Sequence, residues 1–281
     1  MSTETYHQNG HQNGIDLSNV YKFSRQVPAN PILTTAVSAV VDKAVCLNRR
    51  VVVIEQGAQE LLTEDSGYVT LFADHESHMD GVTVAESFQP YGPYALLVAA
   101  DSWDLHNPIN SALAHSYNMV PVERKGKQVP ENMTIARPDD LLNILNDRIN
   151  VIFSPAGGRG IGFQFQKGAA YLAAEAEKSV ITVGLAGGKD VMPKGSKFPS
   201  LGRTISIYID AISYPDLITH YRGKFKITSL TDFFQDRMKN LHQRAQELIH
   251  HDWSDWAKKT GRLIPHFGYE RVTHSKGQIY P

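Results

Sequence analysis

Residues 68–88 read YVTLFADHESHMDGVTVAESF, and this stretch decides the fold. It opens with Tyr68–Ala73, a largely apolar run of the kind found in strands that are buried on both faces. It closes with Val82–Phe88, which has helical character. Two histidines, two aspartates and a glutamate lie between these segments, at the end of the strand, where side chains converge without the constraint of a regular helix. The stretch therefore predicts a buried strand, a polar loop and a helix in succession.

The alternation of strand and helix continues along the chain. Apolar runs predict further strands at Val51–Ile54, Tyr94–Ala100, Met119–Glu123, Asn150–Ser154, Val180–Leu185 and Thr204–Ile212. Helical segments are predicted at Pro31–Leu47, Asn107–His115, Asp139–Asp147 and Gly168–Lys178, and around Phe234–Leu248. This order indicates an α/β fold, with a mostly parallel central sheet flanked by helices.

The composition is that of an ordinary globular protein. The 281 residues include 28 Lys and Arg against 29 Asp and Glu, so the net charge is −1. This charge balance gives no global positive field to attract nucleic acid, and we expect no nucleic-acid partner. The single cysteine, Cys46, excludes an internal disulfide and a cysteine-based zinc cluster.

The sequence divides into a tail and one domain. The near-repeat HQNGHQNG at 7–14 has almost nothing to bury, so residues 1–15 are predicted to be a disordered tail and residues 16–281 a single domain. No apolar run is long enough to span a membrane, and the first thirty residues are too polar for a signal peptide. We expect a cytoplasmic protein, with peripheral attachment at the inner membrane face left open. An apolar face for attachment would come from residues 31–47 or from Trp253 and Trp256. Equally, these side chains could pack into the protein core.

His75 and Asp80 are the strongest candidates for chemistry. A histidine that is fixed by a carboxylate can deprotonate a hydroxyl near neutral pH. The same spacing occurs twice more, at His11/Asp16 and His250/Asp255. We favour the pair at 75 and 80 because it follows a strand directly, whereas the others lie in the tail and at the end of a helix. The plain alternative is that Asp80 caps the helix that follows.

Two further segments follow in a recognisable order, Val120–Arg124 and Phe153–Arg159. Together with the HxxxxD spacing of His75 and Asp80, they resemble the sequence blocks of the glycerolipid acyltransferases, the PlsC-like superfamily. The third block is closest to the Pro-Ser-Gly-Gly-Arg variant of soluble chloroplast-type glycerol-3-phosphate acyltransferases. Phe165–Ala169 is similar to the Phe-Lys-Lys-Gly-Ala segment of that superfamily.

The resemblance implies transfer of an acyl group from an acyl-CoA or acyl-carrier-protein thioester to a hydroxyl of a glycerol-phosphate or lysophospholipid-type acceptor. It implies no metal and no other cofactor. His75 would be the general base, and Asp80 would orient its ring and stabilise the imidazolium. Residues that would bind the anionic acceptor or the thioester are Arg124, Gly157, Gly158, Arg159 and Lys167.

Several alternatives stay open. Ala156 stands where the family usually has Glu, which favours a non-glycerolipid acceptor such as a sugar lipid, an amine or a hydroxylated metabolite. A binding protein with a degenerate fold is a second alternative. A third is a metal-dependent hydrolase with ligands from His75, His78, Asp80 and either His106 or His115. Arg124 has the alternative of a strand-end ion pair, and Gly157–Gly158 that of an ordinary turn.

Overall fold

The computed structural model of this chain describes residues 11–12, 15–46, 48–63, 67–124, 126–158, 162–193, 196, 199–220, 226–250 and 268–274.

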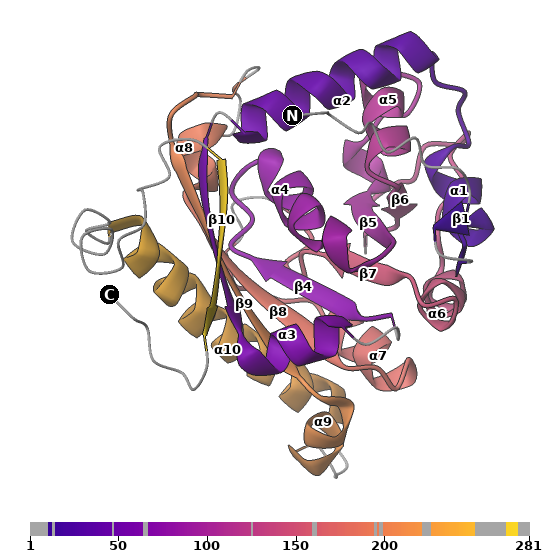
Figure 1. Cartoon of the computed structure of the whole chain (residues 1–281). Coiled ribbons are helices and arrows are strands. Elements are labelled where there is room, and N and C mark those ends of the chain that lie inside the picture. The colour runs from indigo at the N-terminus through magenta and orange to yellow at the C-terminus, as the bar shows by residue number, and fades with distance from the viewer. Residues whose placement is uncertain are drawn as a thin grey trace.

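The described residues form one large mixed sheet and a two-stranded ribbon (Figure 1). The large sheet has eight strands in the order β10-β3-β9-β8-β4-β7-β5-β6. All neighbours are parallel except β8 and β9, which confirms the prediction of a mostly parallel sheet. The strands are β3 (Arg49–Glu55), β4 (Val69–Ala73), β5 (Tyr94–Ala99), β6 (Met119–Val122), β7 (Asn150–Phe153), β8 (Val180–Ala186), β9 (Thr204–Ile212) and β10 (Gly268–His274).

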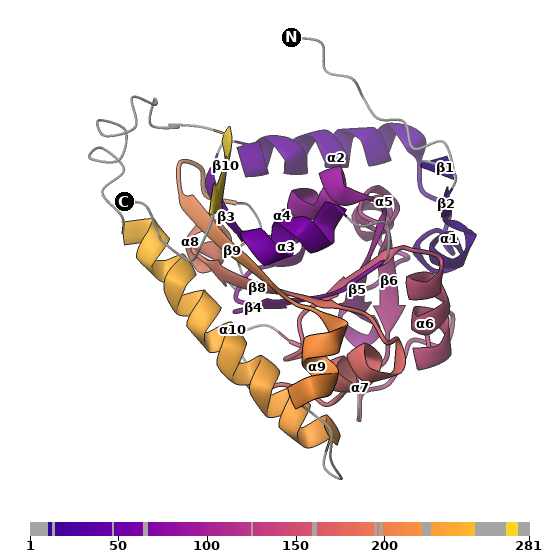
Figure 2. The ribbon, with the colours of Figure 1, turned by 60° about the horizontal axis from the view of Figure 1, so that its bottom comes forward.

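Helices cover both faces of this sheet, as Figure 2 shows. One face carries α2 (Pro31–Cys46), α3 (Gln56–Thr63), α4 (Met79–Phe88) and α5 (Pro108–Ser116). The other face carries α1 (Ser18–Ser24), α6 (Pro138–Asn146), α7 (Gly168–Glu175), α9 (Tyr214–His220) and α10 (Lys226–His250). Short turns of helix follow three elements: η1 (Gln89–Tyr91), η2 (Ala100–Ser102) and α8 (Gly188–Val191).

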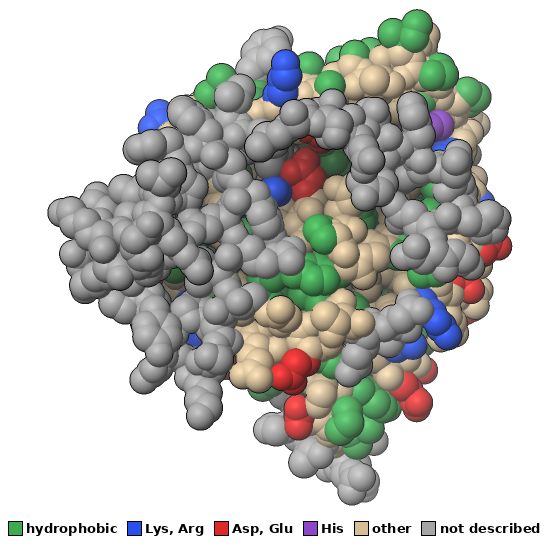
Figure 3. All heavy atoms as spheres, viewed as in Figure 1, with side chains coloured by type: hydrophobic (Ala, Val, Ile, Leu, Met, Phe, Trp, Pro, Cys, Tyr) green, Lys and Arg blue, Asp and Glu red, His purple; other side chains and the backbone are tan. Residues whose placement is uncertain are grey.

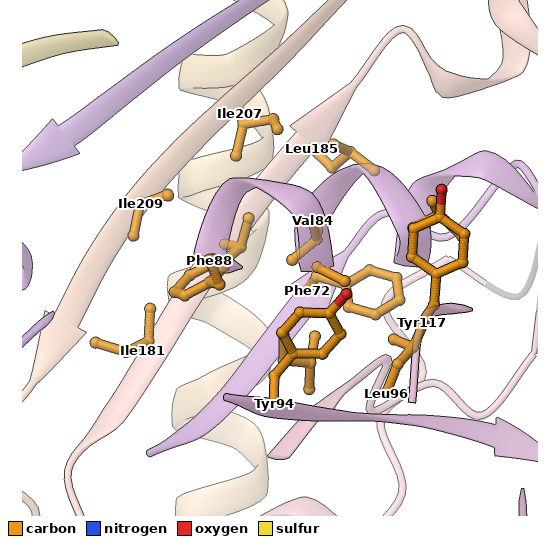
Figure 4. Packing of buried hydrophobic residues seen from close by; sticks show 14 of the residues in the cluster. Phe72, Val84, Phe88, Tyr94, Leu96, Tyr117, Ile181, Leu185, Ile207 and Ile209 are labelled. Carbon is orange, nitrogen blue, oxygen red and sulfur yellow. The ribbon is translucent and has the colours of Figure 1, made fainter. Parts of the chain in front are cut away.

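The core has a layer on each side of the sheet because side chains alternate along each strand. Phe72, Leu96 and Ile181 point to the α4 side, where they pack with Val84 and Phe88 (Figure 4). On the other face, α10 lies directly on β8. A Cβ at Gly184 would lie 2.2 Å from the carbonyl carbon of Leu241, so only glycine permits this approach.

Most predicted elements are present, with shifted ends. The helix predicted at Val82–Phe88 begins earlier, at Met79, and the strand predicted to end at Ala100 ends at Ala99. The helices α1, α3 and α9 were not predicted. The short strands β1 (His11–Gln12) and β2 (Ile15–Asp16) pair at the end of the predicted tail, while residues 1–10 lie outside the described residues. The division into a tail and one domain stays a prediction.

Within the described residues, no helix combines the length and apolarity that crossing a membrane requires. The helix predicted at 31–47 forms as α2, and its outer side carries the exposed side chains of Ile32 and Val40. In Figure 3, hydrophobic side chains are visible along the top of the molecule, where α2 lies in Figure 1. Trp253 and Trp256 lie outside the described residues.

Candidate active site

The candidate residues gather at one edge of the sheet because five strands run in the same direction. The strands β8, β4, β7, β5 and β6 are parallel neighbours, so their carboxyl ends lie together. The chain leaves this edge through His75–Asp80 after β4, Arg124 after β6 and Ser154–Gly158 after β7. Ligands of open α/β sheets bind outside the carboxyl ends of the strands. The fold thus brings three segments that are distant in sequence to the place where a ligand would bind.

His75 is held by Asp80. Its Nδ1 lies 3.2 Å from Asp80 Oδ2, and its ring packs edge-on against Phe72 with 5.5 Å between ring centroids. Because Oδ2 also accepts two backbone N–H groups, the contact with His75 is completed by a proton on Nδ1, and this tautomer has a lone pair on Nε2. The His75 side chain is 21% exposed, which leaves the ring accessible. A histidine held in this way can act as a general base.

Asp80 is nearly completely buried and organises the loop before α4. Its Oδ2 also accepts hydrogen bonds from the backbone N–H groups of Glu76, at 2.7 Å, and Ser77, at 2.6 Å. These donors precede the helix, so the carboxylate ties the loop to the first turn of α4 rather than capping its N-terminus. The N–H of Met79, the first residue of α4, donates its hydrogen bond to Ser77 Oγ at 3.1 Å and not to Asp80. The helix-cap interpretation of Asp80 is therefore wrong.

Gly188 lies against the Oδ1 atom of the Asp80 carboxylate, and it was not predicted from the sequence. Its Cα packs so closely on Asp80 that an added Cβ would lie 2.0 Å from Oδ1. Asp80 Oδ1 is buried and has no hydrogen-bond partner among the described residues. The available signal was the pair Gly187–Gly188, one residue beyond the predicted strand Val180–Leu185. Gly188 leaves room for Asp80, whereas Gly187 lies against the carbonyl oxygen of Thr204.

Glu76 adds a second carboxyl group beside the pair. Partial burial raises its pKa, although Lys189 on α8, whose Nζ lies 4.0 Å from Glu76 Oε1, opposes the effect. Asp74 and Asp80 raise the Glu76 pKa further, and His242 lowers it. His242 lies on α10, and its Nδ1 is 2.6 Å from the carbonyl oxygen of Leu185 near the carboxyl end of β8. The loops after β4 and β8 therefore interact through charge as well as through close packing.

Arg124 is extensively bonded. Its Nε donates to Asp101 Oδ1 at 2.8 Å, and its Nη2 donates to Asp101 Oδ2 and to Ser102 Oγ. Its Nη1 donates to the carbonyl of Gly157 at 2.9 Å. The Arg124 fork lowers the pKa of Asp101, and Asp101 raises that of Arg124. The ion pair that was the plain alternative for Arg124 is thus present, and Asp101 is a site residue that the sequence interpretation missed.

The structure describes three of the four remaining predicted binding residues. Gly157 has φ +72°, which favours glycine, and its N–H donates to the Ser154 carbonyl at 3.1 Å within a turn. Gly158 is half-buried beside it, and Lys167 is exposed immediately before α7. Arg159 lies outside the described residues. Gly157 therefore forms a tight turn, and the Arg124 hydrogen bond fixes its position.

The ligand set that the hydrolase alternative requires does not come together. Among the residues that the structure describes, no three His, Cys, Asp or Glu side chains are grouped as metal ligands would be. His115 Nε2 lies 2.9 Å from the Val27 carbonyl oxygen, and His78 is an exposed residue at the start of α4. His75 and Asp80 are the two members of that set that lie together.

Comparisons with known proteins support the fold. The sequence matches no family model and no curated protein. Eight chains of solved structures match the structure. One is the 1-acyl-sn-glycerophosphate (LPA) acyltransferase PlsC from Thermotoga maritima, with a TM-score of 0.51 and 15% sequence identity over 76% of this chain and 79% of that one. The chain therefore has a fold similar to that of PlsC.

Proposed function

We propose that the protein is an acyltransferase that moves an acyl group from a thioester to the hydroxyl of an anionic acceptor, with His75 as general base. The observation that carries the proposal is the His75–Asp80 contact after β4, in which Nδ1 lies 3.2 Å from Asp80 Oδ2. A proton on Nδ1 in this contact would leave Nε2 as the proton acceptor. Two observations support it: the second and third sequence blocks meet at this edge, and the fold is similar to that of a glycerophosphate acyltransferase.

The chemistry follows from this arrangement. His75 Nε2 takes the proton of the acceptor hydroxyl as its oxygen attacks the thioester carbonyl carbon. The negative Asp80 stabilises the imidazolium that results. The tetrahedral intermediate collapses, the carbon–sulfur bond breaks, and the imidazolium returns the proton to the departing thiolate. The products are an ester and a free thiol, and the reaction requires no covalent enzyme intermediate and no metal.

The donor is an acyl-CoA or an acyl-carrier-protein thioester in this proposal, and the acceptor is a glycerol phosphate or a lysophospholipid. Arg124, Gly158, Arg159 and Lys167 supply charge and backbone donors for the anionic substrates. A non-glycerolipid acceptor is the second candidate. It is favoured by Ala156, which removes the usual acidic side chain of the third block.

We also propose peripheral contact with the inner face of a membrane through α2. The Ile32 and Val40 side chains are 81% and 66% exposed, and both lie on the outer side of this helix. Binding to anionic vesicles in a flotation assay would support the contact, and recovery of all the protein below the vesicles would exclude it.

A thiol-release assay tests the activity. Purified protein is incubated with an acyl-CoA or an acyl-carrier-protein thioester, with and without glycerol 3-phosphate, lysophosphatidic acid or a panel of hydroxylated and amine metabolites. Thiol release that depends on an acceptor, together with the acylated acceptor in the mass spectrum, supports the proposal. Absence of release from every donor and acceptor pair would leave a binding protein as the better account.

A further inference from the structure

Asp101 occupies the edge of Arg124 that a substrate anion would need. The Nε and Nη2 groups of Arg124 point in parallel at the two carboxylate oxygens of Asp101. This fork is the geometry in which arginine binds carboxylates and phosphates bidentately. Asp101 therefore stands in for an anionic ligand, supplied by the protein itself from the end of β5.

A separate contact fixes the orientation of the guanidinium. Arg124 Nη1 donates to the Gly157 carbonyl, and Gly157 belongs to the third sequence block. This bond uses a different nitrogen from those that Asp101 engages. If Asp101 moved away, the Gly157 bond would still aim the Nε and Nη2 edge at the same place. The side chains are 27% exposed for Arg124 and 15% for Asp101, so a ligand can reach the pair from solvent.

We propose that Asp101 is a latch residue, which covers Arg124 in the empty protein and is displaced by the phosphate monoester of the acceptor. This inference rests on the proposed function and extends it to the class of acceptor. Displacement exposes a preformed bidentate site, and the Gly157 contact keeps that site beside the third block. Asp101 thereby becomes a specificity-determining residue.

The latch selects phosphate over carboxylate. A free carboxylate would have to compete for Arg124 with the chemically equivalent carboxylate of Asp101. Asp101 would win this competition, because it is tethered beside Arg124 and so has a high effective concentration. A phosphate monoester carries a charge of about −1.5 to −2 near neutral pH and has three strong acceptor oxygens. It can therefore compete where a carboxylate cannot. The lowered pKa of Asp101 keeps the latch ionised, so mild acid does not open it.

Calorimetric titration with inorganic phosphate and with acetate tests the latch at constant ionic strength. We expect the wild-type protein to bind phosphate and to show no measurable binding of acetate. Asp101→Asn keeps the size of the side chain and removes its charge, so phosphate should bind at least about tenfold more tightly and acetate should become a ligand. Adding Arg124→Ala to this variant should abolish both gains.

Asp210→Asn is the matched control. Asp210 forms an ion pair with Arg237, and the side chains are 23% and 29% exposed, close to the values for Asp101 and Arg124. Phosphate affinity should stay within about twofold of wild type in this control. If phosphate binds to Asp101→Asn no more tightly than to wild type, Asp101 positions Arg124 instead of competing for it, and the latch is wrong.

A measurement on the wild-type protein covers the case in which Asp101→Asn does not fold. The Nε–H resonance of Arg124 is assigned by its loss in Arg124→Lys. Phosphate should shift it, whereas acetate at the same ionic strength should not. An unmoved resonance at saturating phosphate would overturn the latch. Phosphate and acetate are simple anions, so their binding does not depend on acyl transfer. If the protein released no thiol, the proposed function would be contradicted, but the phosphate and acetate results would still decide the latch.

Discussion

At the scale of the residue, Asp80 combines two tasks in one carboxylate. Its Oδ2 fixes the His75 ring and receives two backbone N–H groups, while its Oδ1 faces Gly188 without a hydrogen bond. An asparagine can place its amide oxygen at the Oδ2 position and keep all three hydrogen bonds. The substitution thus separates the charge of the group from its geometry.

We expect Asp80→Asn to lower kcat by about a hundred- to ten-thousand-fold, because the neutral amide cannot stabilise the imidazolium. The apparent KM for the thioester should change little, and the circular dichroism spectrum should match that of wild type. Steady-state thiol release measures both parameters. A kcat equal to that of wild type would show that Asp80 only shapes the loop.

Gly188→Ala should abolish the proposed acyl transfer by another route. The new Cβ would lie 2.0 Å from Asp80 Oδ1, so the carboxylate or the α8 turn must move and the His75 contact is lost. Gly57→Ala in α3 is the matched control, because its Cβ meets nothing within 4 Å and alanine favours a helix. We expect kcat to fall at least about a hundredfold for Gly188→Ala and to remain unchanged for Gly57→Ala. Equal rates for the two variants would remove Gly188 from the site.

At the scale of the element, α4 connects the candidate site to a partly buried polar cluster at its other end. Glu86 in α4 lies 3.1 Å from Arg50 of β3, and the Tyr117 hydroxyl lies 3.0 Å from Asp42 of α2 and 3.5 Å from Glu86. Burial raises the pKa of Glu86 to about 7, Arg50 opposes the shift, and Asp42 adds to it. The charged form of Glu86 is therefore disfavoured in the folded protein.

This cluster predicts a pH-dependent stability. The folded protein holds the Glu86 proton more tightly than the unfolded chain, whose pKa is near 4.5. The stability that this proton contributes is lost as the pH rises from about 5 to 7, and it amounts to about 2 to 3 kcal/mol. We expect the free energy of unfolding in urea to fall by this amount from pH 5 to pH 8, relative to Glu86→Gln. Parallel pH profiles for the two proteins would contradict the assignment to Glu86.

The sequence predicted the elements better than their ends. Val82–Phe88 was predicted because its pattern is local, but the turn at Met79 forms because Ser77 and Asp80 bond to backbone groups around it. Such bonds leave no periodic signal. The helix α3 was missed because its sequence, QGAQELLT, buries only Ala58 and Leu62.

At the scale of the whole molecule, the parallel strands explain why the position of the candidate site could be predicted in part. Polar residues that follow apolar runs lie at the carboxyl ends of the strands, and His75, Asp80 and Arg124 were chosen as candidates on this basis. Asp101 gave the same signal, since it follows the predicted strand Tyr94–Ala100, but its partner could not be inferred without the order of β5, β7 and β6. Strand order and the reversed direction of β9, β3 and β10 depend on long-range packing that local patterns do not encode.

The central claim is that His75 is the base for acyl transfer, and one comparison tests it most directly. Acceptor-dependent thiol release is measured for wild type, His75→Ala and His106→Ala, since His106 is an exposed turn residue. We expect His75→Ala to lose at least about a hundredfold in rate with its fold intact, and His106→Ala to keep the wild-type rate. A rate for His75→Ala close to that of wild type would contradict it.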